Sequence, residues 1–151
     1  MKKIFLGALI ICFLFLVSAC GLNEKTLSCS SNNEQNNIII NGKSIYKFKD
    51  DKLSTGYYDV VFKYNKVNNV DSLWASFKSQ LEEQNEEVDI KGYKSTINFN
   101  DKNYEFSAKA NIDFEKISDD DLKKYNLSQY KNKSYDELKE YLEKEEKQTC
   151  K

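Results

Sequence analysis

The chain has no histidine, arginine or proline, and only 5 of its 151 residues are glycine. Without histidine it cannot build a Ser-His-Asp triad, a Cys-His pair or an imidazole metal site. Its 23 lysines nearly balance 24 acidic residues, which gives a formal net charge of −1. A nucleic-acid partner would require a concentrated basic surface, rich in arginine for bidentate contacts. We therefore expect no nucleic-acid partner and no cofactor, and the commonest enzyme chemistries are excluded.

The longest apolar run lies at the N-terminus. Two lysines, Lys2 and Lys3, precede an unbroken apolar stretch from Ile4 to Val17, and the small residues Ser18 and Ala19 follow it. About 14 helical residues rise only about 21 Å, which is less than the roughly 30 Å hydrocarbon core of a bilayer. The basic start, the short apolar run and the small residues predict a signal peptide over residues 1–19.

The residues 17–20, Val-Ser-Ala-Cys, resemble the lipobox of bacterial lipoproteins. The resemblance implies cleavage before Cys20, a diacylglycerol on the Cys20 thiol and acylation of the new amino group. Several acyl chains together hold a protein firmly to a membrane, whereas one chain binds only marginally. We therefore expect a lipid-anchored protein on the extracytoplasmic face of the cell membrane. The alternative is an ordinary secretory signal with a chance cysteine.

Residues 20–37 are rich in Asn and Ser and show no hydrophobic periodicity. Such a segment buries too little apolar area to offset the entropy of ordering it. It is expected to be a flexible polar tether, which leaves residues 38–151 as a single folded domain.

Two segments with period-two alternation predict a hairpin after the tether. Their apolar residues share one parity in each segment: Ile38, Ile40, Tyr46 and Phe48, then Tyr58, Val60, Phe62 and Tyr64. The pair Asp50-Asp51 is the candidate turn. Asn41-Gly42 is also a strong turn signal, so an alternative is that the first segment forms two short strands joined by a turn.

Helical periodicity follows over residues 71–84. Five apolar side chains fall on one face at helical spacing: Val70, Leu73, Trp74, Phe77 and Leu81. This pattern predicts an amphipathic helix. Trp74 is expected to anchor the helix to the sheet rather than to bind a ligand.

A second hairpin is predicted between residues 88 and 114, with residues 100–103 as its turn. The parity of the apolar residues switches between Ile90 and Tyr93, and Gly92 lies between them. A β-bulge at this glycine would return both sets to the same face.

The C-terminal third is charged and helical in pattern. Ser118 precedes three aspartates, and Ser134 begins a capping box with Glu137, so both serines are expected to start helices. The last helix is expected to end near Lys147. The predicted fold is α+β: an antiparallel sheet of four to five strands, formed by two hairpins around an amphipathic helix, with the C-terminal helices packed on one face.

The four cysteines divide into three groups. Cys12 would leave with the signal peptide and Cys20 would carry lipid, so Cys29 and Cys150 remain. In an exported protein we expect these two to form a disulfide. Two free thiols are the alternative.

Candidate sites for chemistry are few. Residues 119–121 are three aspartates, but they lack the spaced ligands and the glycine of a calcium loop, so no metal site is expected. Acidic residues are plentiful, yet nearly all fall at positions predicted to face solvent, and no catalytic residue is assigned. Tyr57, Tyr125 and Tyr130 depart from the apolar pattern and are weak candidates for an exposed binding surface.

The order of lipobox, polar tether, two hairpins and capped helices resembles small lipoproteins of low-G+C Gram-positive bacteria. It is similar to the YehR-like lipoprotein family, whose α+β domains have no assigned function. The resemblance loosely covers most of residues 38–151, and it implies no functional residue beyond the lipidated cysteine.

The function expected from these features is that of a membrane-anchored, non-enzymatic binding or envelope-accessory module. One alternative is a subunit that captures a ligand for a transporter. A more remote alternative is a hydrolase of the cell envelope that uses a pair of carboxylates.

Overall fold

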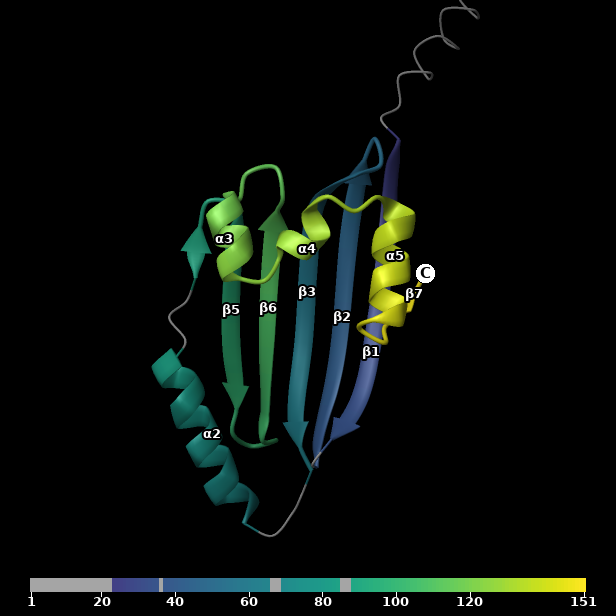
Figure 1. Ribbon diagram of the computed structural model, residues 1–151. Helices are drawn as coiled ribbons and strands as arrows, with labels where there is room; N and C mark the ends of the chain where they lie inside the picture. Colours follow the sequence, from purple (N-terminus) through teal and green to yellow (C-terminus); the bar gives the residue numbers. More distant parts are fainter. Residues whose placement is uncertain (1–22, 36, 66–68, 85–87) are drawn as a thin grey trace, which may run out of the picture.

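The computed structural model describes residues 23–35, 37–65, 69–84 and 88–151. They form an α+β domain with one open antiparallel sheet of seven strands and four helices (Figure 1). Across the sheet the strand order is β4-β5-β6-β3-β2-β1-β7. The strands are β1 Glu24–Gln35, β2 Ile38–Lys49, β3 Lys52–Tyr64, β4 Asp89–Ile90, β5 Tyr93–Asn100, β6 Glu105–Asp113 and β7 Thr149–Cys150. The helices are α2 Val70–Gln84, α3 Asp119–Lys124, α4 Ser128–Lys131 and α5 Tyr135–Lys144.

The hairpin of β2 and β3 forms the middle of the sheet. Asp50 and Asp51 both have positive φ, of 50° and 62°, as a tight two-residue hairpin turn requires. The turn predicted at Asn41-Gly42 is wrong, because both residues lie inside β2 and pair with β3. Gly42 instead leaves room for a neighbouring side chain, since a Cβ there would lie 2.5 Å from the Ser31 hydroxyl oxygen.

Strand β1 occupies most of the segment that was expected to be a flexible tether. It pairs antiparallel with β2 along its full length, from Glu24 opposite Lys49 to Gln35 opposite Ile38. Of its inward-facing residues only Leu27 and Cys29 are apolar and buried, so the strand is stabilised mainly by backbone pairing. The folded domain therefore begins near residue 24 and not at residue 38.

Gly92 forms a turn and not the predicted bulge. Ile90 pairs with Tyr93, so Lys91 and Gly92 connect β4 to β5, and the chain reversal explains the switch of parity. Gly92 has a φ of +84°, and a Cβ there would lie 2.4 Å from the backbone nitrogen of Ile117. The close approach admits only glycine. With β1, β4 and β7 added, the sheet has more strands than the four or five expected.

Helices α3, α4 and α5 lie across one half of one face of the sheet, at the end where β1 begins (Figure 1). We call this the covered half of the inner face. The hydrophobic core lies beneath these helices and includes fully buried side chains of both layers: Leu27, Tyr46, Phe48, Phe114, Leu122, Leu138 and Leu142. The sheet and these three helices thus share one core at this end.

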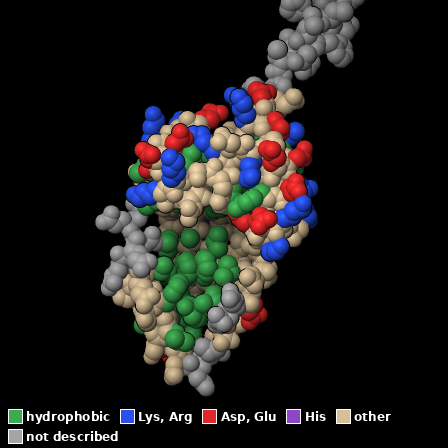
Figure 2. All heavy atoms as spheres, viewed as in Figure 1, with side chains coloured by type: hydrophobic (Ala, Val, Ile, Leu, Met, Phe, Trp, Pro, Cys, Tyr) green, Lys and Arg blue, Asp and Glu red, His purple; other side chains and the backbone are tan. Residues whose placement is uncertain are grey.

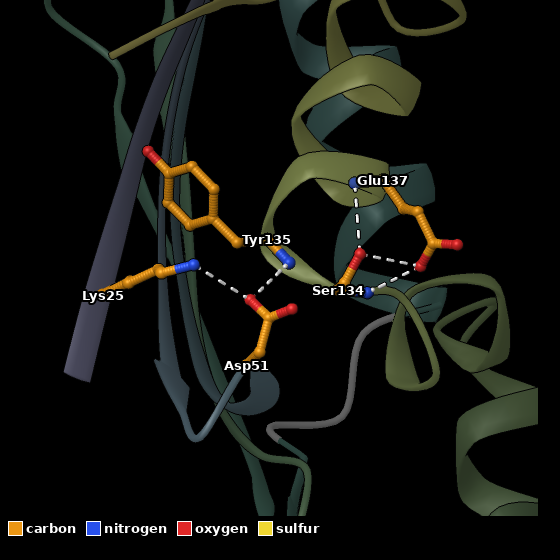
Figure 3. A network of polar contacts seen from close by, with 5 residues as sticks. All are labelled: Lys25, Asp51, Ser134, Tyr135 and Glu137. Carbon is orange, nitrogen blue, oxygen red and sulfur yellow. Dashed lines mark hydrogen bonds and ion pairs between the residues drawn. The ribbon is translucent and has the colours of Figure 1, made fainter. Parts of the chain in front are cut away.

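The predicted helix starts are confirmed. The Ser118 hydroxyl accepts from the backbone of Asp121 at the start of α3, and Ser134 and Glu137 form a capping box at α5. Figure 3 shows how the start of α5 is fastened to the sheet. The Asp51 carboxylate accepts from the Tyr135 backbone N–H at 3.4 Å and pairs with Lys25 at 3.3 Å. Helix α5 ends at Lys144, three residues before the predicted end, because the chain then turns to form β7.

The predicted disulfide is confirmed. Cys29 of β1 and Cys150 of β7 are bonded, with an S–S distance of 2.00 Å and a sequence separation of 121. The two residues are also directly paired across the strands. The bond therefore fixes the C-terminus to the edge of the sheet. Residues 23–151 contain every described strand pair, the disulfide and the core, so this unit carries its own stabilising contacts.

Candidate functional site: an apolar basin on the sheet

The other half of the inner face, towards the lower ends of β1, β2 and β3 in Figure 1, lies outside the layer of α3, α4 and α5. We call it the open half. Figure 2 shows hydrophobic side chains gathered there in a hollow, bordered above by the charged surface of the helical layer. Strand register places these inward-facing apolar residues in it: Ile38, Ile40, Val60, Phe62, Ile97, Phe99, Phe106 and Ala108. All except Phe106 are only partly buried. We name this set the apolar basin.

Helix α2 forms one wall of the basin, and Trp74 is its main anchor. Trp74 is 5% exposed, and its ring meets the edges or faces of Tyr64, Phe99 and Tyr104 at centroid distances of 6.1–6.3 Å. Phe77 packs on Phe106 at 5.2 Å. This is the role predicted for Trp74.

Polar contacts hold this wall to the turn between β5 and β6. The indole N–H of Trp74 donates to Asp101 at 2.8 Å, and Lys78 pairs with the same carboxylate at 2.9 Å. These donors lower the pKa of Asp101 below its ordinary value, the Lys78 hydrogen bond contributing most. Leu73 of α2 is 49% exposed although it belongs to the apolar stripe, so the sheet does not cover the whole stripe.

A polar cluster borders the basin at the boundary with the covered half. The Ser44 hydroxyl donates to the Gln148 side-chain oxygen at 2.9 Å, and the Gln148 amide donates to Glu146 at 2.8 Å. The Tyr130 hydroxyl donates to the other oxygen of Glu146. Ser44 lies two residues from Gly42, which faces Val60 of the basin, so the cluster adjoins the apolar floor. We name Ser44, Tyr130, Glu146 and Gln148 the polar rim.

Two buried tyrosine hydroxyls lie behind the polar rim. The rings of Tyr46 and Tyr58 meet edge to face at 5.5 Å, and neither hydroxyl has a well-formed hydrogen bond among the described residues. Burial raises the pKa of Tyr46 to about 12 and raises that of Tyr58 further. Both hydroxyls are therefore protonated at neutral pH. Burial and the hydrogen bond to Glu146 also raise the pKa of Tyr130.

The structure does not bring together the three tyrosines predicted as a binding surface. Tyr57 lies on the outer face of the sheet, where its hydroxyl donates to Asp59 at 3.1 Å. Tyr130 is 8% exposed on the inner face, and Tyr125 stacks on Tyr93 at 4.5 Å. Each has a packing role, and they share no surface. Departure from the apolar pattern was too weak a signal, because the short helices α3 and α4 lack a clear periodicity.

Tyr57 does line a groove of about 580 Å³ on the outer face. The groove also contains Lys47, Lys94, Asp89 and Asn111. Two of its charges are paired with each other, Lys94 with Asp89 at 3.1 Å. The groove has charged and polar lining residues where the basin has apolar ones, and its polar side chains do not point to a common position. It is therefore the weaker candidate.

The described residues show neither a metal-binding cluster nor a membrane-spanning helix. Within the described ranges, no group of three or more histidine, cysteine or acidic side chains is placed to hold a metal ion. The aspartates of residues 119–121 form the first turn of α3, where one of them pairs with Lys131 at 2.9 Å. None of the helices in the described part of the chain has the length and apolar character needed to cross a bilayer. The expected signal peptide and Cys20 lie outside the described residues.

The basin contains residues that the sequence assigned to an apolar face, but its openness was missed. A usable signal was present in the lengths of the C-terminal helices. Helices α3, α4 and α5 have 6, 4 and 10 residues, while β1, β2 and β3 have 12, 12 and 13. A helix rises only about 1.5 Å per residue and a strand about 3.3 Å, so these helices cannot cover the strands from end to end.

Comparison with known proteins gives no further identification. A scan against protein-family models, a search of curated proteins and a search of solved structures each find no match to this chain. The resemblance to YehR-like lipoproteins stays a prediction.

Proposed function

We propose that this protein is a lipid-anchored, non-enzymatic binding module on the extracytoplasmic face of the cell membrane, and that the apolar basin is its binding site. The observation that carries the proposal is the half-covered inner face of the sheet. Antiparallel sheets usually bury one face and leave the other to solvent. Here the apolar face is itself left partly open, and contiguous apolar surface of this kind marks binding sites.

The lipid anchor is supported by the lipobox-like residues 17–20 and by the position of the first strand. Strand β1 begins at Glu24, and the first described residue, Asn23, is only the third residue after Cys20. Three extended residues reach at most about 11 Å. An anchor at Cys20 would hold the domain against the membrane surface rather than at the end of a long tether.

Metabolic labelling with palmitate, with and without globomycin, tests the anchor. We expect label on the wild-type protein and retention in the membrane fraction, and loss of both for Cys20→Ser. A matched control is Cys12→Ser, which alters a cysteine within the expected signal peptide and should leave labelling intact. An unlabelled wild-type protein, or full retention of Cys20→Ser in membranes, contradicts the anchor.

Binding of the apolar dye 1-anilinonaphthalene-8-sulfonate to the chain of residues 21–151 tests the basin. Val60 and Val61 are adjacent, partly buried valines whose side chains point to opposite faces of β3. Val60→Asn should weaken dye binding at least tenfold, whereas Val61→Asn should change it less than twofold. Equal effects of the two substitutions would show that the dye does not occupy the basin.

A further inference from the structure

We infer that the apolar basin holds an acyl chain of an uncharged membrane lipid of the diacylglycerol class, with the hydroxyl-bearing head at the polar rim. This inference rests on the proposed function, since it names the ligand of the same basin. Three features of the structure support this inference. The inward-facing strand residues of the open half are uncharged, the distance along β3 matches an acyl chain, and the polar rim at the upper end of the basin suits an uncharged head.

The floor of the basin is uncharged. From the row of Cys29 and Ser44 to the far ends of the strands, no inward-facing residue of β1, β2, β3, β5 or β6 carries a charge. A protein partner or an amphipathic helix normally carries charged residues at the margin of its apolar face. A binding site for such a partner therefore has residues of opposite charge around its own apolar surface. On its strands the open half offers no charged residue that could match such a margin. The charged side chains that border it belong to the helical layer and to the α2 wall, where Lys78 and Asp101 are paired with each other at 2.9 Å. An uncharged floor suits an acyl chain.

The length of the floor suits an acyl chain. From the row of the polar rim at Tyr58 to Tyr64, β3 spans six residues, or about 20 Å at about 3.3 Å per residue, and the apolar floor from Val60 to Tyr64 takes about 13 Å of it. One leaflet of a bilayer has a hydrocarbon thickness of about 15 Å, half of the roughly 30 Å core. An extended chain drawn from a leaflet therefore fits along β3, between the rings of α2 and the residues of β2.

The polar rim favours an uncharged head. Glu146 contributes a carboxylate, and Gln148 and Ser44 contribute an amide and a hydroxyl. A carboxylate accepts hydrogen bonds from glycerol hydroxyls and repels a phosphate, which is already ionised. The disulfide holds the polar rim in place. Cys29 pairs with Ser44 across β1 and β2, and its partner Cys150 lies two residues after Gln148.

The lipid expected on Cys20 is not a suitable occupant. The first described residue, Asn23, lies at the end of the sheet where α5 begins, and the basin lies at the other end (Figure 1). From Asn23 to Ser31, at the upper edge of the basin, β1 spans eight residues or about 26 Å. The helical layer lies over this path. The occupant is therefore a separate lipid molecule.

Trp74 makes the inference directly testable, because it is the only tryptophan and forms a wall of the basin. Diacylglycerol with brominated acyl chains, presented in phosphatidylcholine vesicles, quenches tryptophan on contact. With residues 21–151 we expect saturable quenching of Trp74, and at least tenfold weaker quenching by brominated phosphatidylglycerol. Ala108→Phe fills the floor between Val60 and Ile97 and should abolish quenching, whereas its outward-facing neighbour variant Ser107→Phe should not.

The polar rim is tested separately by Glu146→Gln, which removes the charge and keeps the shape. In this variant the ratio of the affinity for brominated diacylglycerol to that for brominated phosphatidylglycerol should fall at least threefold, while quenching by diacylglycerol persists. Circular dichroism and urea titration of each variant establish that it is folded.

The outcomes separate the inference from the proposed function. No quenching by either brominated lipid, with dye binding still sensitive to Val60→Asn, overturns the lipid and leaves the binding module. Equal quenching by both lipids overturns the uncharged head. A dimer in sedimentation that Ala108→Phe dissociates makes a second copy the occupant and overturns the lipid. Dye binding unaffected by Val60→Asn overturns the basin itself, and with it both proposals.

Discussion

The two halves of the inner face are built from the same strands but differ in what covers them. In the covered half, Tyr46, Phe48, Leu138 and Leu142 are at most 1% exposed. In the open half, residues of the same strands and the same parity, such as Ile40 and Val60, are only partly buried. Strand alternation therefore determines which face is apolar, but the helices determine which part of that face becomes core.

The comparison implies a division of labour within one sheet. Stability should come mainly from the covered half, where sheet and helices bury a shared core. Binding should come from the open half, where apolar surface is left available. The disulfide between Cys29 and Cys150 lies on the boundary row, and so it contributes to both.

The largest expected effect is the loss of the disulfide. In the chain-entropy model a loop of this size contributes about 4–5 kcal/mol to the free energy of unfolding. Cys29→Ala together with Cys150→Ala should lower the urea midpoint accordingly, and dithiothreitol should lower that of the wild type to the same value. A double variant as stable as the oxidised protein would show that the boundary row is held by packing alone.

Cavity-forming substitutions should separate the two halves next. Leu138 is 0% exposed in the covered half, so Leu138→Ala should cost roughly 3 kcal/mol, within the usual range of about 2–5. Val60→Ala in the open half removes fewer contacts and should cost less than about 1 kcal/mol. Urea unfolding followed by circular dichroism measures both. Equal losses would mean that the basin is packed like core.

Alkaline pH should act through the buried tyrosines at the boundary, which are Tyr46, Tyr58 and Tyr130. Burial raises the pKa of Tyr46 to about 12 and that of Tyr58 further, from the ordinary value of 10.0. Above pH 10 the unfolded chain therefore releases protons that the folded protein keeps, so stability is fully present below pH 10 and falls as pH rises towards 12. The slope should reach about 1.4 kcal/mol per pH unit for each tyrosine.

Substitution of a single hydroxyl isolates this effect. Tyr58→Phe should reduce the alkaline slope and cost little at pH 7, because it removes a buried hydroxyl without a standard partner. Tyr57→Phe, on the outer face, is the matched control and should leave the slope unchanged. Urea midpoints from pH 8 to 12 provide the measurement, and a wild-type profile that is flat over this range would contradict the burial.

The sequence predicted the fold class, the inner parity of the central strands, helix α2, the two serine caps and the disulfide. These features depend on local periodicity, capping chemistry and the redox environment. It did not predict β1, because Ser31 and Asn33 face inward without apolar side chains and the strand depends on pairing with β2. It did not predict the turn at Gly92, since a reversal and a bulge change parity alike. The basin depends on how far the helices reach, which is a tertiary property.

The smallest effect on overall stability, and the sharpest on the open half, is expected from Asp101→Ala. Asp101 accepts from the Trp74 indole at 2.8 Å and pairs with Lys78 at 2.9 Å, and both contacts hold α2 to the turn after β5. The carboxylate is exposed, and exposed ion pairs contribute little to stability, so the urea midpoint should barely move. Trp74 emission should nevertheless shift to longer wavelength, and amide exchange should accelerate in α2 alone.

The control for this last change is Asp89→Ala, which breaks an exposed pair with Lys94 between β4 and β5 and leaves the contacts of α2 intact. It should alter neither Trp74 emission nor exchange in α2. If Asp101→Ala instead lowers the urea midpoint as far as Leu138→Ala does, then α2 unfolds together with the covered half. The two halves of the inner face would then be one cooperative unit.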